Sequence, residues 1–160
     1  MNRIEIVRAS VDKILLNMTD NEERRCAYIH LYGVSQSCAL LAKKRKENPE
    51  LAVIAGMLHD IYSYSTMDSD DHAHKGAKMA KEILESLKTE SKEMFTAKEI
   101  NLISTAIYNH SDKELVHDAL SEILKDADVM QHILYNPLFE IKPHEQARFR
   151  NLSEEFGLDS

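Results

Sequence analysis

Met57-Leu58-His59-Asp60-Ile61 is an apolar stretch of helical pattern that ends in an imidazole beside a carboxylate. Both side chains are common ligands of transition metals. Other histidines and aspartates of the chain lie where they could converge on this pair. The sequence therefore predicts a metal site at the end of this helix, with the remaining helices packed around it.

The composition favours a helical protein with a single core. The chain has 160 residues, of which 43% are hydrophobic, with only 4 Gly and 3 Pro. Scarce Gly and Pro disfavour an all-β fold with many tight turns, and this length suits one domain. We expect a single domain over 1–160, with its core at about 22–136 and a C-terminal loop and helix at 137–160.

Charge and apolar content exclude several partners. The formal net charge of −7 opposes binding to duplex nucleic acid, whereas a bound metal would still permit a small phosphorylated substrate. The apolar runs are too short to cross a membrane, and no signal-peptide pattern opens the chain. Cys26 and Cys38 lie too far apart on one predicted helix to form a disulfide. A cytoplasmic location is therefore expected.

Apolar residues that recur every three or four positions predict helices and no strand. Asp20 is expected to cap the second helix, and Thr96 with Glu99 forms a capping box before the fifth. Gly157 is expected to end the last helix, and residues 63–71 are predicted to form a polar loop. The predicted helices span about 4–18, 22–46, 49–60, 71–91, 97–110, 114–135 and 143–156.

Six ligand-type residues lie on the inner faces of different predicted helices or at their ends. A single His on an apolar face is usually an ordinary core residue, but a buried Asp is rare unless it is paired or bound to metal. Four histidines and two aspartates in such positions are difficult to explain one by one. The sequence therefore predicts a metal site with the candidate ligands His30, His59, Asp60, His72, His110 and Asp128.

The helix faces also choose between neighbouring candidates. His74 shares a polar face with lysines, which favours His72 as the ligand. Asp126 aligns with other acidic residues, which favours Asp128. His132 lies one turn after Asp128 and remains a rival for the site. The histidines expected at the surface are His117 and His144.

The order of these residues resembles the HD-domain superfamily of metal-dependent phosphohydrolases. His30 comes first, the His59-Asp60 doublet follows an apolar run, and Asp128 comes last. The resemblance covers about Arg25 to His132. It implies an all-α fold, an HD-domain-like bundle of about six or seven helices with the site at its centre.

Two further histidines are similar to those of the two-metal branch of this superfamily. His72 lies four residues before Gly76, and His110 ends a helix. That branch includes HD-GYP phosphodiesterases and HD-type diadenosine tetraphosphate hydrolases. Ser111 follows His110 where HD-GYP proteins carry paired histidines, and no Gly-Tyr-Pro signature is present. Specificity for cyclic dinucleotides is therefore not expected.

The resemblance implies a metal-dependent phosphohydrolase that acts on a nucleotide or another small phosphorylated compound through metal-activated water. Phosphomonoesterase, phosphodiesterase and pyrophosphohydrolase activities all remain open. Mixed His and carboxylate ligands suit Fe, Mn, Co, Ni or Zn, and two ions are expected. We assign the first ion to His30, His59, Asp60 and Asp128, and the second to His72 and His110, with Asp60 as the bridge.

His59 and Asp60 are the expected catalytic residues, and three lysines are candidates for contact with substrate phosphate. These are Lys75, Lys113 and Lys125, although each also suits an ordinary surface position. The predicted helix at 143–156 could pack on its own domain or form a homodimer. Two alternatives for the function stay open: a di-iron oxygenase of the same fold, and a non-catalytic nucleotide-binding module stabilised by metal.

Overall fold

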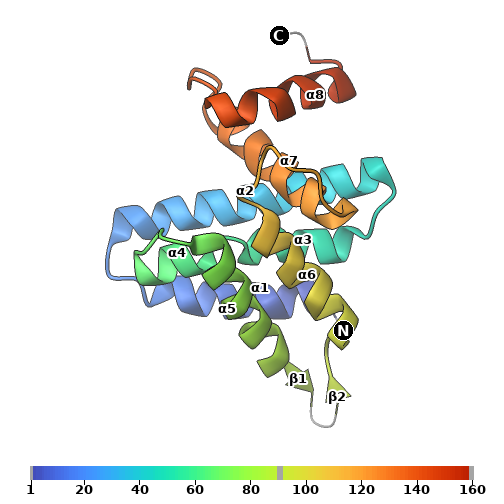
Figure 1. Cartoon of the computed structure of the whole chain (residues 1–160). Coiled ribbons are helices and arrows are strands. Elements are labelled where there is room, and N and C mark those ends of the chain that lie inside the picture. The colour runs from blue at the N-terminus through green and yellow to red at the C-terminus, as the bar shows by residue number, and fades with distance from the viewer. Residues whose placement is uncertain (1, 90–91, 159–160) are drawn as a thin grey trace.

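The computed structural model describes residues 2–89 and 92–158, and this part of the chain is mainly helical (Figure 1). The predicted all-α class is therefore confirmed. Two short strands and a 3-10 helix accompany the α-helices. In chain order the elements are α1 (Arg3–Leu16), α2 (Asn21–Arg45), α3 (Pro49–Leu58), α4 (Ile61–Thr66), α5 (His72–Ser86), β1 (Lys88–Thr89), β2 (Lys92–Glu93), α6 (Ala97–Asn109), α7 (Ala119–Tyr135), the 3-10 helix Pro143–Glu145 and α8 (Gln146–Phe156).

The long helix α2 packs against α3 and α7, and this packing forms the centre of the molecule (Figure 1). Leu31 and Val34 of α2 and Leu58 of α3 are completely buried. A Cβ atom at Gly56 would lie 2.7 Å from the Cα atom of Ser35, so only glycine permits this approach of α3 to α2. The position that carries the His-Asp doublet is thus fixed by close helix packing.

The helix ends agree with the capping residues expected from the sequence. The Asp20 carboxylate accepts hydrogen bonds from the backbone N–H groups of Glu22 and Glu23, at 2.8 Å and 3.0 Å. Thr96 and Glu99 form the reciprocal capping box. Gly157 follows α8 with a φ of 62°, a left-handed conformation that favours glycine.

The predicted polar loop at 63–71 is wrong in its first half, because α4 continues the chain as a helix to Thr66. Ile61 at its start is completely buried, which anchors this short helix to the core. The hydroxyl of Thr66 donates to the carbonyl oxygen of Tyr62 at 2.8 Å, so polar residues of this segment satisfy the backbone within a helical turn. Met67 ends α4 with a φ of 57°.

Two further boundaries differ from the sequence prediction. The helix expected to reach residue 91 ends at Ser86, and the backbone of β1 then pairs with β2 as a short antiparallel ladder; residues 90–91 lie outside the described chain. The helix expected from residue 114 begins only at Ala119, with Asp118 as its cap. Residues 111–118 therefore form a connecting loop beside α7. None of the helices within 2–89 and 92–158 is long and apolar enough to cross a membrane.

Candidate metal centre

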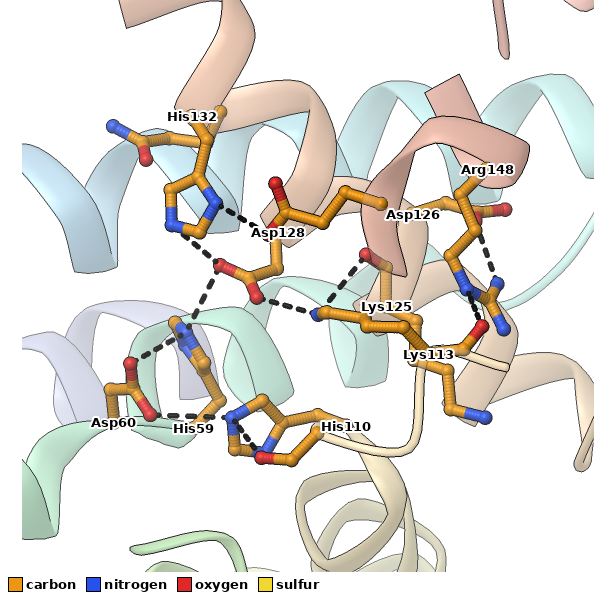
Figure 2. Close-up of polar contacts among 12 residues, drawn as sticks. His59, Asp60, His110, Lys113, Lys125, Asp126, Asp128, His132 and Arg148 are labelled. Atoms are coloured by element: carbon orange, nitrogen blue, oxygen red, sulfur yellow. Dashed lines mark hydrogen bonds and ion pairs between the residues drawn. The ribbon is translucent and has the colours of Figure 1, made fainter. Parts of the chain in front are cut away.

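Five residues from four places in the chain meet at the centre of the helical bundle, and Figure 2 labels all of them except the one on α2. One lies on α2, two at the bend between α3 and α4, one at the end of α6 and one on α7. All but Asp60, whose side chain is 21% exposed, are buried. We call this set the ligand cluster: His30, His59, Asp60, His110 and Asp128.

One half of the ligand cluster joins α2, α3 and α7. The Nε2 atoms of His30 and His59 lie 3.1 Å apart, and the Oδ1 atom of Asp128 lies 3.5 Å and 3.8 Å from them. An ion with ligands at about 2.0–2.2 Å holds those ligands roughly 3–3.5 Å apart. His30, His59 and Asp128 thus have spacings close to those of ligands around a single ion.

The other half of the ligand cluster shares His59 and adds Asp60 and His110. The Oδ2 atom of Asp60 lies 3.4 Å and 3.5 Å from the Nε2 atoms of His30 and His59. Its Oδ1 atom faces the opposite way and lies 3.3 Å from Nε2 of His110 (Figure 2). The two oxygens of one carboxylate therefore face different groups of histidines, and His59, Asp60 and His110 form a second set with metal-ligand spacing.

The histidines present the same nitrogen to the centre because the other nitrogen is already bonded. The Nδ1–H groups of His59 and His110 donate to the carbonyl oxygens of Gly56 and Ile107, at 2.9 Å and 2.7 Å. These carbonyls belong to the last turns of α3 and α6, where backbone acceptors lack helical partners. Each Nε2 atom is left with a free lone pair that faces the cluster.

His30 is held in the same way, but by a side chain. Its Nδ1–H group donates to the Oε1 atom of Gln131 at 2.9 Å. The side chain of Gln131 packs so closely over α2 that a Cβ atom at Gly33 would lie 2.8 Å from its Cγ atom. Gln131 and Gly33 escaped the sequence interpretation, although Gln131 lies only three residues after Asp128, a spacing that places both on one side of α7.

Two buried carboxylate oxygens of the ligand cluster lack hydrogen-bond partners among the residues that the structure describes. They are Oδ1 of Asp60 and Oδ1 of Asp128. Nitrogens of His110 and His132 approach them to 3.3 Å and 3.4 Å, but without hydrogen-bonding geometry. Buried charged oxygens are costly without partners, and facing imidazole lone pairs repel each other. Both features fit a bound cation.

The surroundings of the ligand cluster shift the pKa values of its aspartates and of His59. Burial would raise the pKa of Asp128, but the charges of Lys113, His59 and His30 outweigh it and hold that pKa well below its usual range. The pKa of Asp60 is held low against its burial by its histidine neighbours, above all His59. Burial lowers the pKa of His59 to about 4. At neutral pH the carboxylates are therefore ionised and His59 is neutral, as metal ligands must be; His59 carries a charge that lowers the pKa of the carboxylates only in acid.

His72 lies at the edge of the ligand cluster rather than in either set. It begins α5, and its Nε2 atom lies 3.7 Å from Oδ1 of Asp60, with the side chain 31% exposed. The hydroxyl of Ser111 contacts this nitrogen at 3.1 Å and Nε2 of His110 at 3.5 Å. His74 instead pairs with Asp71 at the surface. Ser111, which the sequence interpretation treated only as a departure from relatives, thus joins the two histidines.

The three candidate phosphate-binding lysines have carboxylate partners. The Nζ atom of Lys125 is enclosed by the carbonyl of Leu115 and the side chains of Glu122 and His117, so it is already bonded within the fold. Lys113 lies at the ligand cluster, but its Nζ atom contacts Oδ2 of Asp128 at 2.6 Å (Figure 2). Lys75 is the most exposed of the three and pairs with Asp68 at 3.0 Å.

Four other residues singled out in the sequence lie in or beside α7 or near the C-terminal helix. Asp126 does not lie on a solvent face: it is 9% exposed, because α8 covers it. His117 is partly buried against Lys125 rather than free at the surface. His132 stacks on His30 with ring centroids 5.3 Å apart, so it borders the ligand cluster without belonging to either set of ligand spacing. His144 is exposed, as expected.

Fold and site together define a helical protein with a buried, histidine- and aspartate-rich centre suited to a divalent metal ion. The model of the HD domain family matches residues 27–132, which is most of the chain. The chain therefore belongs to the HD domain family, and the resemblance drawn from its His-Asp doublet is confirmed. Neither a curated protein nor a solved structure matches the chain.

Proposed function

We propose that this protein is a metal-dependent phosphohydrolase that acts on a nucleotide or another small phosphorylated compound. The observation that carries the proposal is the pair of ligand sets that share His59, with the two oxygens of Asp60 facing different histidines. A bridging carboxylate between two ions is a common arrangement in phosphoester hydrolysis. Membership of the HD domain family supports the same chemistry.

The residues divide between two proposed ions. His30, His59, Asp60 and Asp128 would hold the first. His110 and, at the edge, His72 would hold the second together with Asp60. Such ions, of Fe, Mn, Co, Ni or Zn, lower the pKa of a coordinated water and stabilise charge on a phosphoryl group.

The residues of the chain supply access and orientation. A pocket of about 320 Å³ opens over Asp60 and His72 and is lined further by Glu23, Ser63, Tyr64, Met67 and Ser69. This volume suits a small ligand. Because Asp60 is ionised, it can accept a hydrogen bond from an attacking water and so orient it. His59, whose Nδ1 atom is fixed on Gly56, keeps the centre rigid.

Phosphate contact by a lysine is a weaker part of the proposal. The amino groups of Lys113 and Lys125 are already bonded within the fold. Lys75 is 36% exposed and remains the candidate, although its partner Asp68 would have to release it. Positive charge for the phosphoryl group would therefore come chiefly from the metal site.

A panel of phosphomonoesters, phosphodiesters and nucleoside polyphosphates, assayed with each candidate metal, tests the function. We expect hydrolysis by the wild type, and none by folded His59→Ala and Asp60→Ala variants. Full activity in both variants would contradict the proposal. Turnover that needs dioxygen would instead support the oxygenase, and tight nucleotide binding without turnover would support the non-catalytic module.

Location and partners belong to the same proposal. Cys26 and Cys38 are both free, which suits a reducing compartment such as the cytoplasm. A small phosphorylated substrate remains preferred to duplex nucleic acid because of the net charge of −7. The homodimer stays a prediction, to be tested by the mass of the protein in solution.

A further inference from the structure

We propose that Arg148, on the C-terminal helix α8, is a positioning residue for the metal centre. It acts through the backbone of the loop 111–118 and through Lys113, which holds Asp128. Arg148 lies beyond residues 27–132, where the family match ends. The inference rests on the proposed metal site, and it means that α8 helps to position the metal ligands.

The first step is that Arg148 forms hydrogen bonds directly with the backbone of the loop 111–118. Its Nε atom donates to the carbonyl oxygen of Lys113 at 2.7 Å, and its NH2 group donates to the carbonyl oxygen of Leu115 at 3.1 Å. Arg148 is only 8% exposed. A single guanidinium thus fixes two backbone groups of a segment whose own backbone hydrogen bonds are confined to turns.

The second step is the anchoring of Arg148 itself. Its NH1 group donates to Glu122 at 2.9 Å and to Asp126 at 2.8 Å, both on α7. Asp126 also pairs with Arg45 of α2 at 2.8 Å, and Arg45 pairs with Glu155 of α8 at 2.7 Å. We call these five residues the arginine cluster: Arg45, Glu122, Asp126, Arg148 and Glu155. These contacts hold α8 against α7, so the guanidinium of Arg148 is held in position beside the loop.

The third step joins the loop to the ligand cluster. With its backbone held by Arg148, Lys113 directs its Nζ atom to Oδ2 of Asp128 at 2.6 Å (Figure 2). That contact occupies one oxygen of the carboxylate. The other, Oδ1, is thereby turned toward His30 and His59. Groups that orient a ligand carboxylate in this way typically contribute about 10- to 100-fold to metal affinity.

An alternative is that Arg148 serves only to attach α8. Arg45 allows the two roles to be separated, because it shares Asp126 with Arg148 but donates to side-chain carboxylates rather than to the loop. Arg45→Met is therefore a matched control for Arg148→Met. Each variant removes a guanidinium from the arginine cluster, and only Arg148→Met releases the carbonyl groups of Lys113 and Leu115.

The experiment measures Mn²⁺ and Zn²⁺ affinity by titration of the chelator-treated full-length protein, together with hydrogen exchange of the amides in 111–118. For Arg148→Met we expect about 10- to 100-fold weaker binding and faster exchange. Lys113→Met should weaken binding to a similar degree, and the double variant should bind no more weakly than the weaker single variant, since one residue acts through the other. Arg45→Met should weaken binding much less than Arg148→Met, because the carbonyl groups of Lys113 and Leu115 stay bonded to Arg148.

Unchanged or tighter metal binding by Arg148→Met, or equal losses in Arg148→Met and Arg45→Met, would overturn the inference. Arg148→Lys answers the same question if Arg148→Met fails to fold, because lysine keeps the charge beside Glu122 and Asp126 but cannot reach both carbonyls at once. These results do not depend on turnover. A protein that binds metal through this arrangement and hydrolyses no phosphoester would contradict the proposed function and leave the role of Arg148 intact.

Discussion

Asp126 and Asp128 lie two residues apart on α7, both buried, in different surroundings. Residues at this spacing point about 200° apart on a helix. Asp126 faces the arginine cluster, where Arg45 and Arg148 each contact it at 2.8 Å. Asp128 faces the ligand cluster, where its Oδ1 atom has no hydrogen-bond partner among the described residues. Both oxygens of Asp126 are paired within the protein, whereas Asp128 is paired with Lys113 through Oδ2 and leaves Oδ1 for a bound cation.

This difference distinguishes a carboxylate that stabilises the fold, Asp126, from one that is proposed to bind metal, Asp128. Buried ion pairs hold a fold together when each charge has its partner, and removal of one partner is costly. Buried carboxylates with unpaired oxygens beside neutral imidazoles lower the stability of the metal-free protein. A bound ligand restores that stability, because it binds only the folded state. The two aspartates should therefore differ in how much activity is lost when each is replaced by Asn.

The largest expected effect is on activity. Asp128→Asn should lower kcat/KM for the best phosphoester by about a thousandfold, since a bound metal supplies several kcal/mol of transition-state stabilisation. Asp126→Asn should lose much less activity than Asp128→Asn, because it reaches the ligand cluster only indirectly, through Arg148. Steady-state kinetics of both folded variants checks this. Similar losses in the two would break the distinction.

The second effect is on stability and concerns the arginine cluster. In chelator-treated protein, Asp126→Asn should lower the free energy of unfolding by about 3 kcal/mol, because Arg45 and Arg148 lose a buried counter-charge. Urea denaturation measures this change. Asp112→Asn, at an exposed position of the neighbouring loop, is the control and should lie within about 0.5 kcal/mol of the wild type. An Asp126→Asn variant as stable as the wild type would show that the arginine cluster does not hold the fold.

The sequence predicts features that depend on residues close together in the chain better than features that depend on contacts between distant residues. The helices, the capping box at Thr96 and the convergence of His30, His59 and Asp128 follow from periodicity and spacing, which a single helix displays. The burial of Asp126 does not, because the polar face of α7 that carries it is covered by Arg148, 22 residues further along the chain. A charged stripe looks the same in sequence whether water or an opposite charge covers it.

The same limit explains the residues that surround the site. The sequence offers Lys113 as a candidate phosphate contact or a surface lysine, because nothing in its neighbourhood shows that a loop brings it to Asp128. Gln131 meets His30 across 101 residues of sequence. The helix α4 was missed because Ser and Thr suggest a loop, whereas buried Ile61 and side-chain bonds to backbone carbonyls keep the segment helical. Contacts between distant elements decided each of these features.

A third prediction concerns Gln131, which holds the proposed ligand His30 in its orientation. Gln131→Leu should weaken metal binding by about tenfold, because the Nδ1–H group of buried His30 loses its acceptor and the ring loses its fixed orientation. Gln131→Glu keeps an acceptor at this position and should bind metal more tightly than Gln131→Leu. Competition titration with a chromophoric chelator ranks the variants. The reverse ranking would show that Gln131 does not orient His30.

The smallest effect concerns pH and the arginine cluster. Burial would raise the pKa of Glu122, but hydrogen bonds from Arg148 and Lys125 outweigh it and lower that pKa. A carboxylate with a lowered pKa contributes stability above its unfolded value of about 4.3, and this contribution is lost as the pH falls toward the folded pKa. The metal-free wild type should therefore lose more stability than Glu122→Gln between about pH 5 and pH 3. Equal losses in urea denaturation would contradict this.

The central claim is that the ligand cluster holds metal, and elemental analysis of protein purified without added metal tests it most directly. His59 is a proposed ligand of the first ion, through its free Nε2 atom. We expect about two transition-metal ions per chain in the wild type and at most one in folded His59→Ala. Wild-type protein without metal, or a His59→Ala variant with the full metal content, would contradict the account.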